Sequence, residues 1–184
     1  QYEFLADTLW PQFAYGRNAV YPQGHHGNAL LSKFAIAHHT NHDVSVEGPE
    51  RRGLLHSVLK VADGRELHAI CVHLGLRESH RQRQCERLCQ LIDSLPPDDP
   101  VIVAGDFNDW RQRAHRMLSR CAGLGEVFVK AYGAAARTFP ARFPLLPLDR
   151  IYVRGASVEH PIVLPRQPWS HLSDHAPLAA EIRL

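Results

Sequence analysis

The sequence lacks an apolar run long enough to span a bilayer, and it lacks a secretory signal. We therefore expect a cytoplasmic protein without stable insertion into a membrane. The formal net charge at pH 7 is only +2, which excludes a constitutive polyanion binder but allows a local basic cleft. Methionine is nearly absent. The single one is Met117 and the chain starts with Gln1, so we expect that a first segment precedes these residues or has been removed.

Cysteine is also scarce, with four in the chain. Cys85 and Cys89 lie one helical turn apart, and no further ligands at zinc-site spacing accompany them. We therefore expect reduced thiols on a partly buried helix. A zinc protein built on the cysteines and the 13 histidines has no supporting ligand spacing.

The length of 184 residues suits a single domain, residues 1–184, with a sizeable core. Apolar arms on both sides of Asp63-Gly64 predict a β-hairpin, and one apolar stripe over residues 78–95 predicts an amphipathic helix. Apolar residues at helical spacing also predict a helix over residues 2–10, whereas the proline, glycine and histidine residues of 21–26 predict a loop. Further strands are expected at residues 28–36, 38–47, 101–104, 148–153, 158–163 and 177–184. The chain is therefore strand-rich α/β.

Residues 101–110 read VIVAGDFNDW and combine an apolar run with oxygen donors. The run follows a proline-rich turn, which predicts a fully buried strand that stops at Gly105. Asp106, Asn108 and Asp109 come next, and carboxylates at the end of a core strand are costly to desolvate unless they have a role. Such donors are what a Mg²⁺ site requires. An equally good interpretation is that these residues close a turn or cap a helix starting near Trp110.

Three other stretches place a polar residue at or just beyond the end of a hydrophobic strand: Val72-His73-Leu74, LDRIYV at residues 148–153, and SDHAP at residues 173–177. GDFN, LDRIYV and SDHAP, in this order, resemble the motifs of the endonuclease/exonuclease/phosphatase superfamily, and GNALLS at residues 27–32 is similar to a further motif. The resemblance implies the fold of deoxyribonuclease I. That fold is a four-layer α/β sandwich, with two mixed β-sheets packed face to face and helices outside, here truncated at the N-terminus.

The resemblance also implies hydrolysis of phosphoester bonds with Mg²⁺ or Mn²⁺. Such a reaction needs a cation to offset phosphoryl charge, a base to orient water, and a group that stabilises the leaving oxygen. By resemblance, Asp106 orients the water, and Asp149 fixes the tautomer of His175 and favours its imidazolium. The implied catalytic set is His73, Asp106, Asn108, Asp149 and His175, and the implied metal set is Asp174, Asp106 and Asn108.

Substrate contacts are expected from Asn28 and from Arg137, which joins other arginines in a candidate basic rim. Each site residue also has a plain structural interpretation. His73 can be a satisfied strand-end histidine, Asp149 can pair with a neighbouring arginine, Asp174 can form an Asx-turn, and a strand-start asparagine such as Asn28 needs no function. The joint occurrence of the motifs in order favours the catalytic interpretation.

Two features of the superfamily are missing from the sequence. They are the asparagine of its first strand and the glutamate of a Gln-Glu pair in its second strand, which is a principal metal ligand. Either these strands precede Gln1 in a complete enzyme, or the chain is a shortened, metal-poor relative. The second case leaves open a non-catalytic binding module derived from the same fold.

The sequence says little about the substrate. It has no basic insertion interleaved with aromatic residues, which a groove-binding nuclease would favour. The apolar loop at residues 137–147 is expected to pack over the sheet edge. A small-molecule or lipid-linked phosphoester therefore fits better than a nucleic acid, and we expect a monomer.

Overall fold

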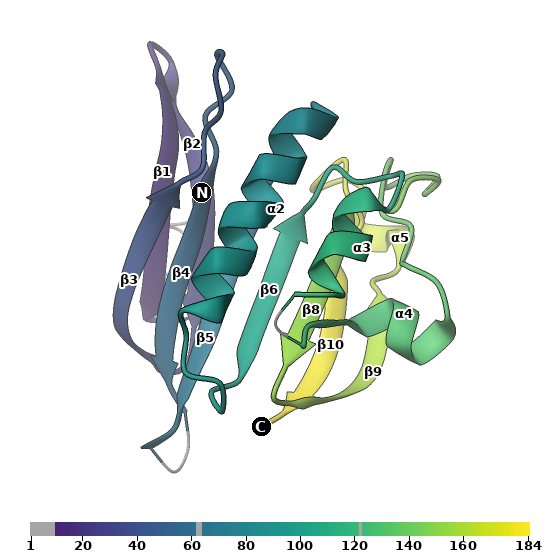
Figure 1. The fold of residues 1–184 in the computed structure, drawn as a ribbon. Coiled ribbons are helices and arrows are strands. Elements are labelled where there is room, and N and C mark those ends of the chain that lie inside the picture. Colours follow the sequence, from purple (N-terminus) through teal and green to yellow (C-terminus); the bar gives the residue numbers. More distant parts are fainter. Residues whose placement is uncertain (1–9, 62–63, 122) are drawn as a thin grey trace.

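A computed structural model describes residues 10–61, 64–121 and 123–184 (Figure 1). The strands are β1 (Gln12–Tyr21), β2 (Gly24–Ser32), β3 (Ala35–Asp43), β4 (Gly53–Lys60), β5 (Glu66–His73), β6 (Val101–Asp106), β7 (Gly125–Glu126), β8 (Asp149–Arg154), β9 (Ser157–Val163) and β10 (Leu178–Arg183). The helices are α2 (Glu78–Asp93), α3 (Arg113–Leu118), α4 (Val127–Tyr132) and α5 (Arg166–Trp169). The helix expected at residues 2–10 lies, apart from Trp10, outside the described residues.

A six-stranded sheet in the order β3-β4-β5-β6-β8-β7 forms the centre of the fold. It is mixed, because β5 and β6 are parallel while its other neighbouring strands are antiparallel. Helices α2 and α3 cover one face, and the antiparallel pairs β1–β2 and β9–β10 lie on the other (Figure 1). The α/β architecture is confirmed. In the described residues the second strand layer consists of two separate hairpins rather than one mixed sheet.

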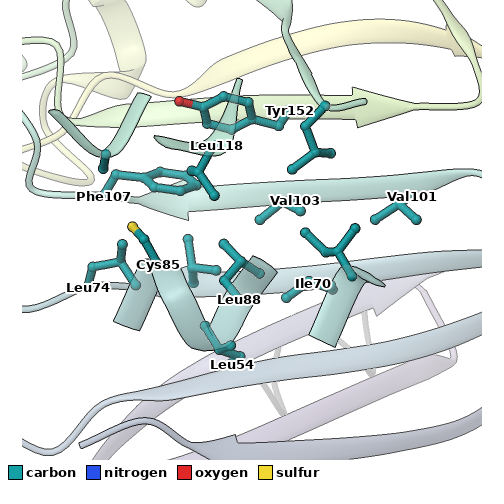
Figure 2. Close-up of a cluster of buried hydrophobic side chains, with 14 of the residues drawn as sticks. Leu54, Ile70, Leu74, Cys85, Leu88, Val101, Val103, Phe107, Leu118 and Tyr152 are labelled. Atoms are coloured by element: carbon teal, nitrogen blue, oxygen red, sulfur yellow. The ribbon is translucent and has the colours of Figure 1, made fainter. Parts of the chain in front are cut away.

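The main core lies between α2 and the six-stranded sheet (Figure 2). Cys85, Leu88 and Ile92 follow the spacing of one helical face and are fully buried against the sheet. Phe107, directly after β6, is also fully buried, and its ring centroid lies 5.3 Å from that of Tyr152 on β8. This core therefore fixes the end of β6 on the side of the sheet that α2 covers.

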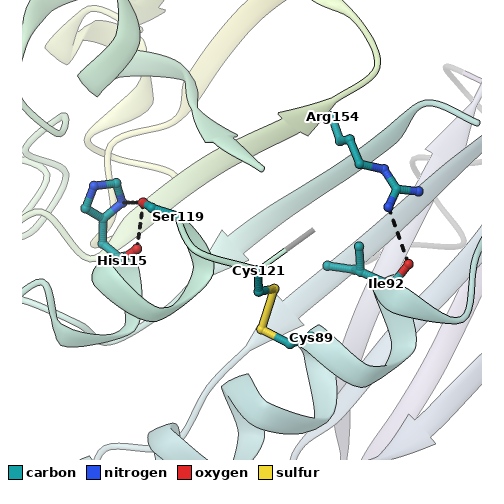
Figure 3. The surroundings of a disulfide bond; sticks show 6 residues. All are labelled: Cys89, Ile92, His115, Ser119, Cys121 and Arg154. Carbon is teal, nitrogen blue, oxygen red and sulfur yellow. Dashed lines mark hydrogen bonds between the residues drawn. A yellow bond between two sulfur atoms is a disulfide. The ribbon is translucent and has the colours of Figure 1, made fainter. Parts of the chain in front are cut away.

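A disulfide joins Cys89 on α2 to Cys121, which follows α3 (Figure 3). The expectation of reduced thiols is therefore wrong for this pair, while Cys71 and Cys85 are free. The spacing of cysteines along the chain could not show the pairing, because the two sulfurs meet only through the packing of α2 against the turn after α3. Burial raises the pKa of the Cys71 thiol to about 11, so this thiol is unreactive at neutral pH.

Two loop and strand assignments near the N-terminus are wrong. Residues 21–26 belong mostly to a β-hairpin, because β1 runs to Tyr21 and β2 begins at Gly24. Residues 28–36 are not one strand, since the chain turns after Ser32, whose Oγ accepts a hydrogen bond from the Phe34 N–H at 2.9 Å. The apolar residues on both sides of this turn concealed it. The expected Asp63-Gly64 hairpin, the helix over residues 78–95 and the edge strand beginning near His38 are confirmed.

Helix α4 was not expected from the sequence. Glu126 caps it by accepting a hydrogen bond from the Val129 N–H at 2.6 Å, and Gly133 ends it with a φ of 76°. Within the described ranges, no helix combines the length and apolar character needed to cross a bilayer.

Candidate active site

Three neighbouring strands carry polar side chains at one level of the central sheet. His73 on β5 is paired with Asp106 on β6, and Asp106 is paired with Asp149 on β8. The His73 Nε2 atom lies 3.6 Å from Asp106 Oδ2. Paired residues on adjacent strands project to the same face, so the sheet register itself brings these three predicted residues together.

The turn after β6 is specified by its sequence. Gly105 has a φ of 141°, and a Cβ atom there would lie 2.0 Å from the Val72 carbonyl oxygen, so only glycine fits. Asn108 has a φ of 50°, a left-handed conformation that asparagine tolerates well, and its N–H donates to Asp106 Oδ1 at 2.8 Å. The Asn108 side chain donates to the Leu74 carbonyl at 2.9 Å. The turn therefore fixes Asp106 and Asn108 together.

His175 reaches this level from the loop before β10. Its Nδ1 atom lies 2.7 Å from Asp149 Oδ2, the short distance of a charge-assisted hydrogen bond. The loop is tied to residues 138–141, because Ala176 N–H donates to the Thr138 carbonyl at 2.8 Å and Ala141 N–H donates to the Asp174 carbonyl at 2.7 Å. The predicted pairing of Asp149 with His175 is thus present in the structure.

The turn and cap interpretations hold for part of the same segment. Asp109 is fully buried, and its carboxylate accepts from the backbone N–H groups of Arg113 and His115 at the start of α3. Arg150 is also buried and donates to the Asp109 carbonyl at 3.1 Å rather than to Asp149. Asp109 therefore caps a helix, which leaves Asp106 and Asn108 as the donors that face the site.

The electrostatic environment separates the site residues by their proton affinity. Burial raises the pKa of Asp106 to about 6, and the negative charge of Asp149 adds to this effect. The hydrogen bond to Asp149 raises the pKa of His175, whereas burial and the charge of Arg52 lower the pKa of His73 to about 4. At neutral pH the site therefore contains a neutral His73, a carboxylate at Asp106 and a histidine whose imidazolium is favoured.

These side chains line a cavity of about 630 Å³, a volume suited to a small organic ligand. The predicted residues in its wall are His73, Asp106, Asn108, Asp149, Asp174 and His175. Arg52 is a wall residue that sequence reasoning missed, because an arginine before a strand carries no distinguishing pattern. Its guanidinium lies 3.2 Å from Glu50 Oε1, and its buried Nε atom has no hydrogen-bond partner among the described residues. The remaining wall residues are Leu76, Trp110, Phe139, Leu146 and Leu148.

The two predicted substrate contacts lie outside the cavity wall. The Asn28 side chain donates to the carbonyls of Gly53 and Cys71 at 2.8 and 3.0 Å, so it fastens β2 to the central sheet. Arg137 is exposed and does not line the cavity. The loop at residues 137–147 is packed down only in part: Thr138 and Ala141 are buried, whereas Phe143 and Leu145 are 70% and 51% exposed.

The metal ligands predicted from the sequence are only partly assembled by the described residues. Asp106, Asn108 and Asp174 line the same cavity, and each has a side-chain oxygen that can ligate a cation. Among described residues, however, the two groups of three ligands that lie within 4.8 Å of one another are elsewhere: Glu66, His68 and Asp99, and Glu159, His160 and Glu181. Among the described residues, the cavity therefore has oxygen-bearing side chains in its wall but no group of three ligand atoms within 4.8 Å of one another.

Comparison with known proteins places the chain in a family. A sequence profile of the Endonuclease/Exonuclease/phosphatase family matches residues 1–175. The uncharacterized protein YbhP of Escherichia coli strain K12 is 59% identical over 184 residues, covering 100% of this chain and 73% of that protein. A UPF0294 protein of Vibrio cholerae is 32% identical over 135 residues, covering 72% of this chain and 46% of that protein.

Solved structures agree with the fold. A humanized D. rerio TDP2 superimposes with a TM-score of 0.78 at 18% identity, covering 100% of this chain and 81% of that one. An endonuclease/exonuclease/phosphatase from Bacteroides vulgatus gives 0.78 at 21% identity, covering 100% and 80%. The predicted deoxyribonuclease I-like fold class is therefore confirmed.

Proposed function

Because the chain belongs to the Endonuclease/Exonuclease/phosphatase family, we propose that it hydrolyses phosphoester bonds with the help of a divalent cation. The observation that supports this most is the Asp149–His175 hydrogen bond, placed in one cavity with Asp106 and Asn108. A module that only binds a ligand has no need for a histidine oriented by a carboxylate.

Each polar group in the wall has a chemical task in this proposal. The Asp106 carboxylate orients a water molecule toward phosphorus and accepts a proton from that water. Its pKa of about 6 suits a base at neutral pH. The His175 imidazolium, held by Asp149, neutralises charge on a phosphoryl oxygen. Neutral His73 lies beside Asp106 and is placed to hydrogen-bond the phosphate or the leaving oxygen.

The donor set fits a hard cation such as Mg²⁺ or Mn²⁺. Asp106, Asn108 and Asp174 would hold it, since all three line the cavity and have side-chain oxygen atoms. The raised pKa of Asp106 also favours a bound cation, because burial and the charge of Asp149 make a negative charge at Asp106 unfavourable unless a cation compensates it. When bound, the cation would offset the charge on the phosphoryl oxygens.

The cavity wall also suggests the kind of substrate. Five apolar residues, including Leu76 and Trp110, surround the polar groups, and Arg52 supplies a cation beside them. The wall therefore suits a phosphoester that carries an organic group next to the phosphate. We propose a small-molecule or lipid-linked phosphoester in preference to a nucleic acid.

Hydrolysis of bis-p-nitrophenyl phosphate, with and without Mg²⁺ or Mn²⁺, tests this function. We expect metal-dependent turnover in the wild type and a loss of at least about 100-fold in Asp106→Asn and His175→Ala. Glu159→Gln, at a residue that does not line the cavity, is the matched control and should retain activity. Turnover that is absent with every metal, in this chain and in its full reading frame, would contradict the proposal and favour a non-catalytic binding module. The incomplete ligand shell is the observation that keeps this alternative open.

A further inference from the structure

A second group of metal-ligating side chains lies at the opposite end of the central sheet from the candidate active site. Glu66 and His68 are at the start of β5, whereas His73 is at its end, and Asp99 is in the turn before β6. One ligand atom from each of these three residues lies within 4.8 Å of the others. Nothing in the proposed phosphoester chemistry uses this group.

The spacing between His68 and Asp99 suits a shared ion better than a direct bond. His68 Nε2 lies 3.3 Å from Asp99 Oδ2, whereas the His175–Asp149 pair in the same protein is 2.7 Å apart. Charge-assisted hydrogen bonds are about 2.7–2.9 Å long. A tetrahedral Zn²⁺ with bonds of about 2.0–2.1 Å places neighbouring ligand atoms about 3.3–3.4 Å apart, which is the observed separation.

His68 is also oriented as a metal-ligating histidine should be. Its side chain is 6% exposed, and its other ring nitrogen, Nδ1, lies 2.9 Å from Nε2 of His56. In the tautomer in which Nδ1 of His68 carries the proton, Nε2 of His56 accepts a hydrogen bond from it. That bond leaves the His68 Nε2 lone pair directed toward Asp99. Metal-ligating histidines commonly have such a partner on the second nitrogen.

From this geometry we propose that Glu66, His68 and Asp99 form a Zn²⁺ site with water as the fourth ligand. One imidazole and two carboxylates suit Zn²⁺, with Mn²⁺ the next best match. Glu66 now forms an ion pair with Lys60, but both side chains are partly exposed and such pairs contribute little, so Glu66 is free to turn toward the ion. The bound ion fastens the turn before β6 to the β4–β5 hairpin.

The chain supplies its own matched control. Glu159, His160 and Glu181 also bring three ligand atoms within 4.8 Å, but His160 and Glu181 are exposed and Glu159 pairs with Arg183 at 2.9 Å. Within the described part of the chain, no buried histidine belongs to this second group. Binding at the proposed site should therefore depend on Asp99 and Glu66 and be indifferent to Glu159.

Calorimetric titration of the chelator-treated full chain with Zn²⁺, in excess Mg²⁺, tests the site. We expect one Zn²⁺ per chain in the wild type and in Glu159→Gln, and at least about tenfold weaker binding in Asp99→Asn and in Glu66→Gln. Zn²⁺ should raise the thermal midpoint of the wild type more than that of Asp99→Asn, and it should shift the ring-nitrogen resonance of His68 Nε2. Equal affinities in all four proteins, or no binding in the wild type, would overturn the proposal.

Discussion

Replacing Asp149 by asparagine tests the central pair of the site. The change keeps the shape of the side chain and removes the charge that holds His175. A hydrogen bond to a charged group is worth about 1.5–3 kcal/mol and a neutral one about 0.5–1.5 kcal/mol, so the variant loses about 1–2 kcal/mol. Both side chains are about three-quarters buried, so solvent screens the loss only modestly. We therefore expect kcat/KM for bis-p-nitrophenyl phosphate to fall about 5- to 30-fold.

The pH profile gives this prediction a second signature. Asp149 raises the pKa of His175, so the imidazolium persists to higher pH in the wild type. In Asp149→Asn the alkaline limb of kcat/KM should move to lower pH, and the His175 ring resonances of the metal-free protein should titrate at lower pH. The Mg²⁺ concentration for half-maximal activity should stay the same, whereas Asp174→Asn should raise it. An unchanged alkaline limb together with an unchanged kcat/KM would refute the role of Asp149.

Three other predictions concern stability. The Cys89–Cys121 disulfide links residues 32 positions apart, so its reduction should lower the free energy of unfolding by about 4 kcal/mol. Urea denaturation measures this change, and equal midpoints with and without reductant would contradict the presence of the bond. Phe107→Ala should cost about 3–5 kcal/mol in the same assay, because the side chain is fully buried. In chelator-treated protein, the pKa of His56 is about 4 in the folded state and 6.5 in the unfolded state, so the unfolded chain binds more protons between these values. The free energy of unfolding should therefore decrease as the pH is lowered from 6.5 to about 4. His56→Gln should reduce this slope by up to about 1.4 kcal/mol per pH unit, and an unchanged slope would show that another group is responsible.

The elements around the motifs could be predicted because their sequence patterns are local. An apolar run that ends at Gly105, with polar residues after it, has few other interpretations than a buried strand and a turn. The hairpin at Gly64 is equally local, since a φ of 74° there requires glycine or a similarly tolerant residue. The arrangement of Asp106, Asp149 and His175 followed from the resemblance of the motifs; the sheet register pairs Asp106 with Asp149, and a hydrogen bond joins His175 to Asp149.

The features that escaped prediction depend on contacts between distant segments. Cys89 and Cys121 meet only after α2 and the turn following α3 have packed, so no spacing rule identifies the pair. Arg52 enters the cavity wall from the loop before β4, and His68 at the start of β5 meets Asp99 in the turn before β6, at the same end of a parallel strand pair. In each case the sequence separation exceeds the range over which periodicity carries information.

The pairing of His73, Asp106 and Asp149 on adjacent strands has a consequence for how this protein can vary. Neighbouring strands are about 4.8 Å apart, a distance set by backbone hydrogen bonds. The spacing of His73, Asp106 and Asp149 is therefore set by the backbone, and it changes little on substitution except where a side chain would enter the strand contact, as at Gly105. The apolar part of the wall comes largely from loops, such as those that carry Trp110 and Leu146. Related chains can then diverge in the loops of the wall while the distance between Asp106 and His73, the proposed base and phosphate contact, stays constant. If the proposed function holds, a swap of residues 137–147 between relatives should transfer substrate preference and leave the pH profile in place.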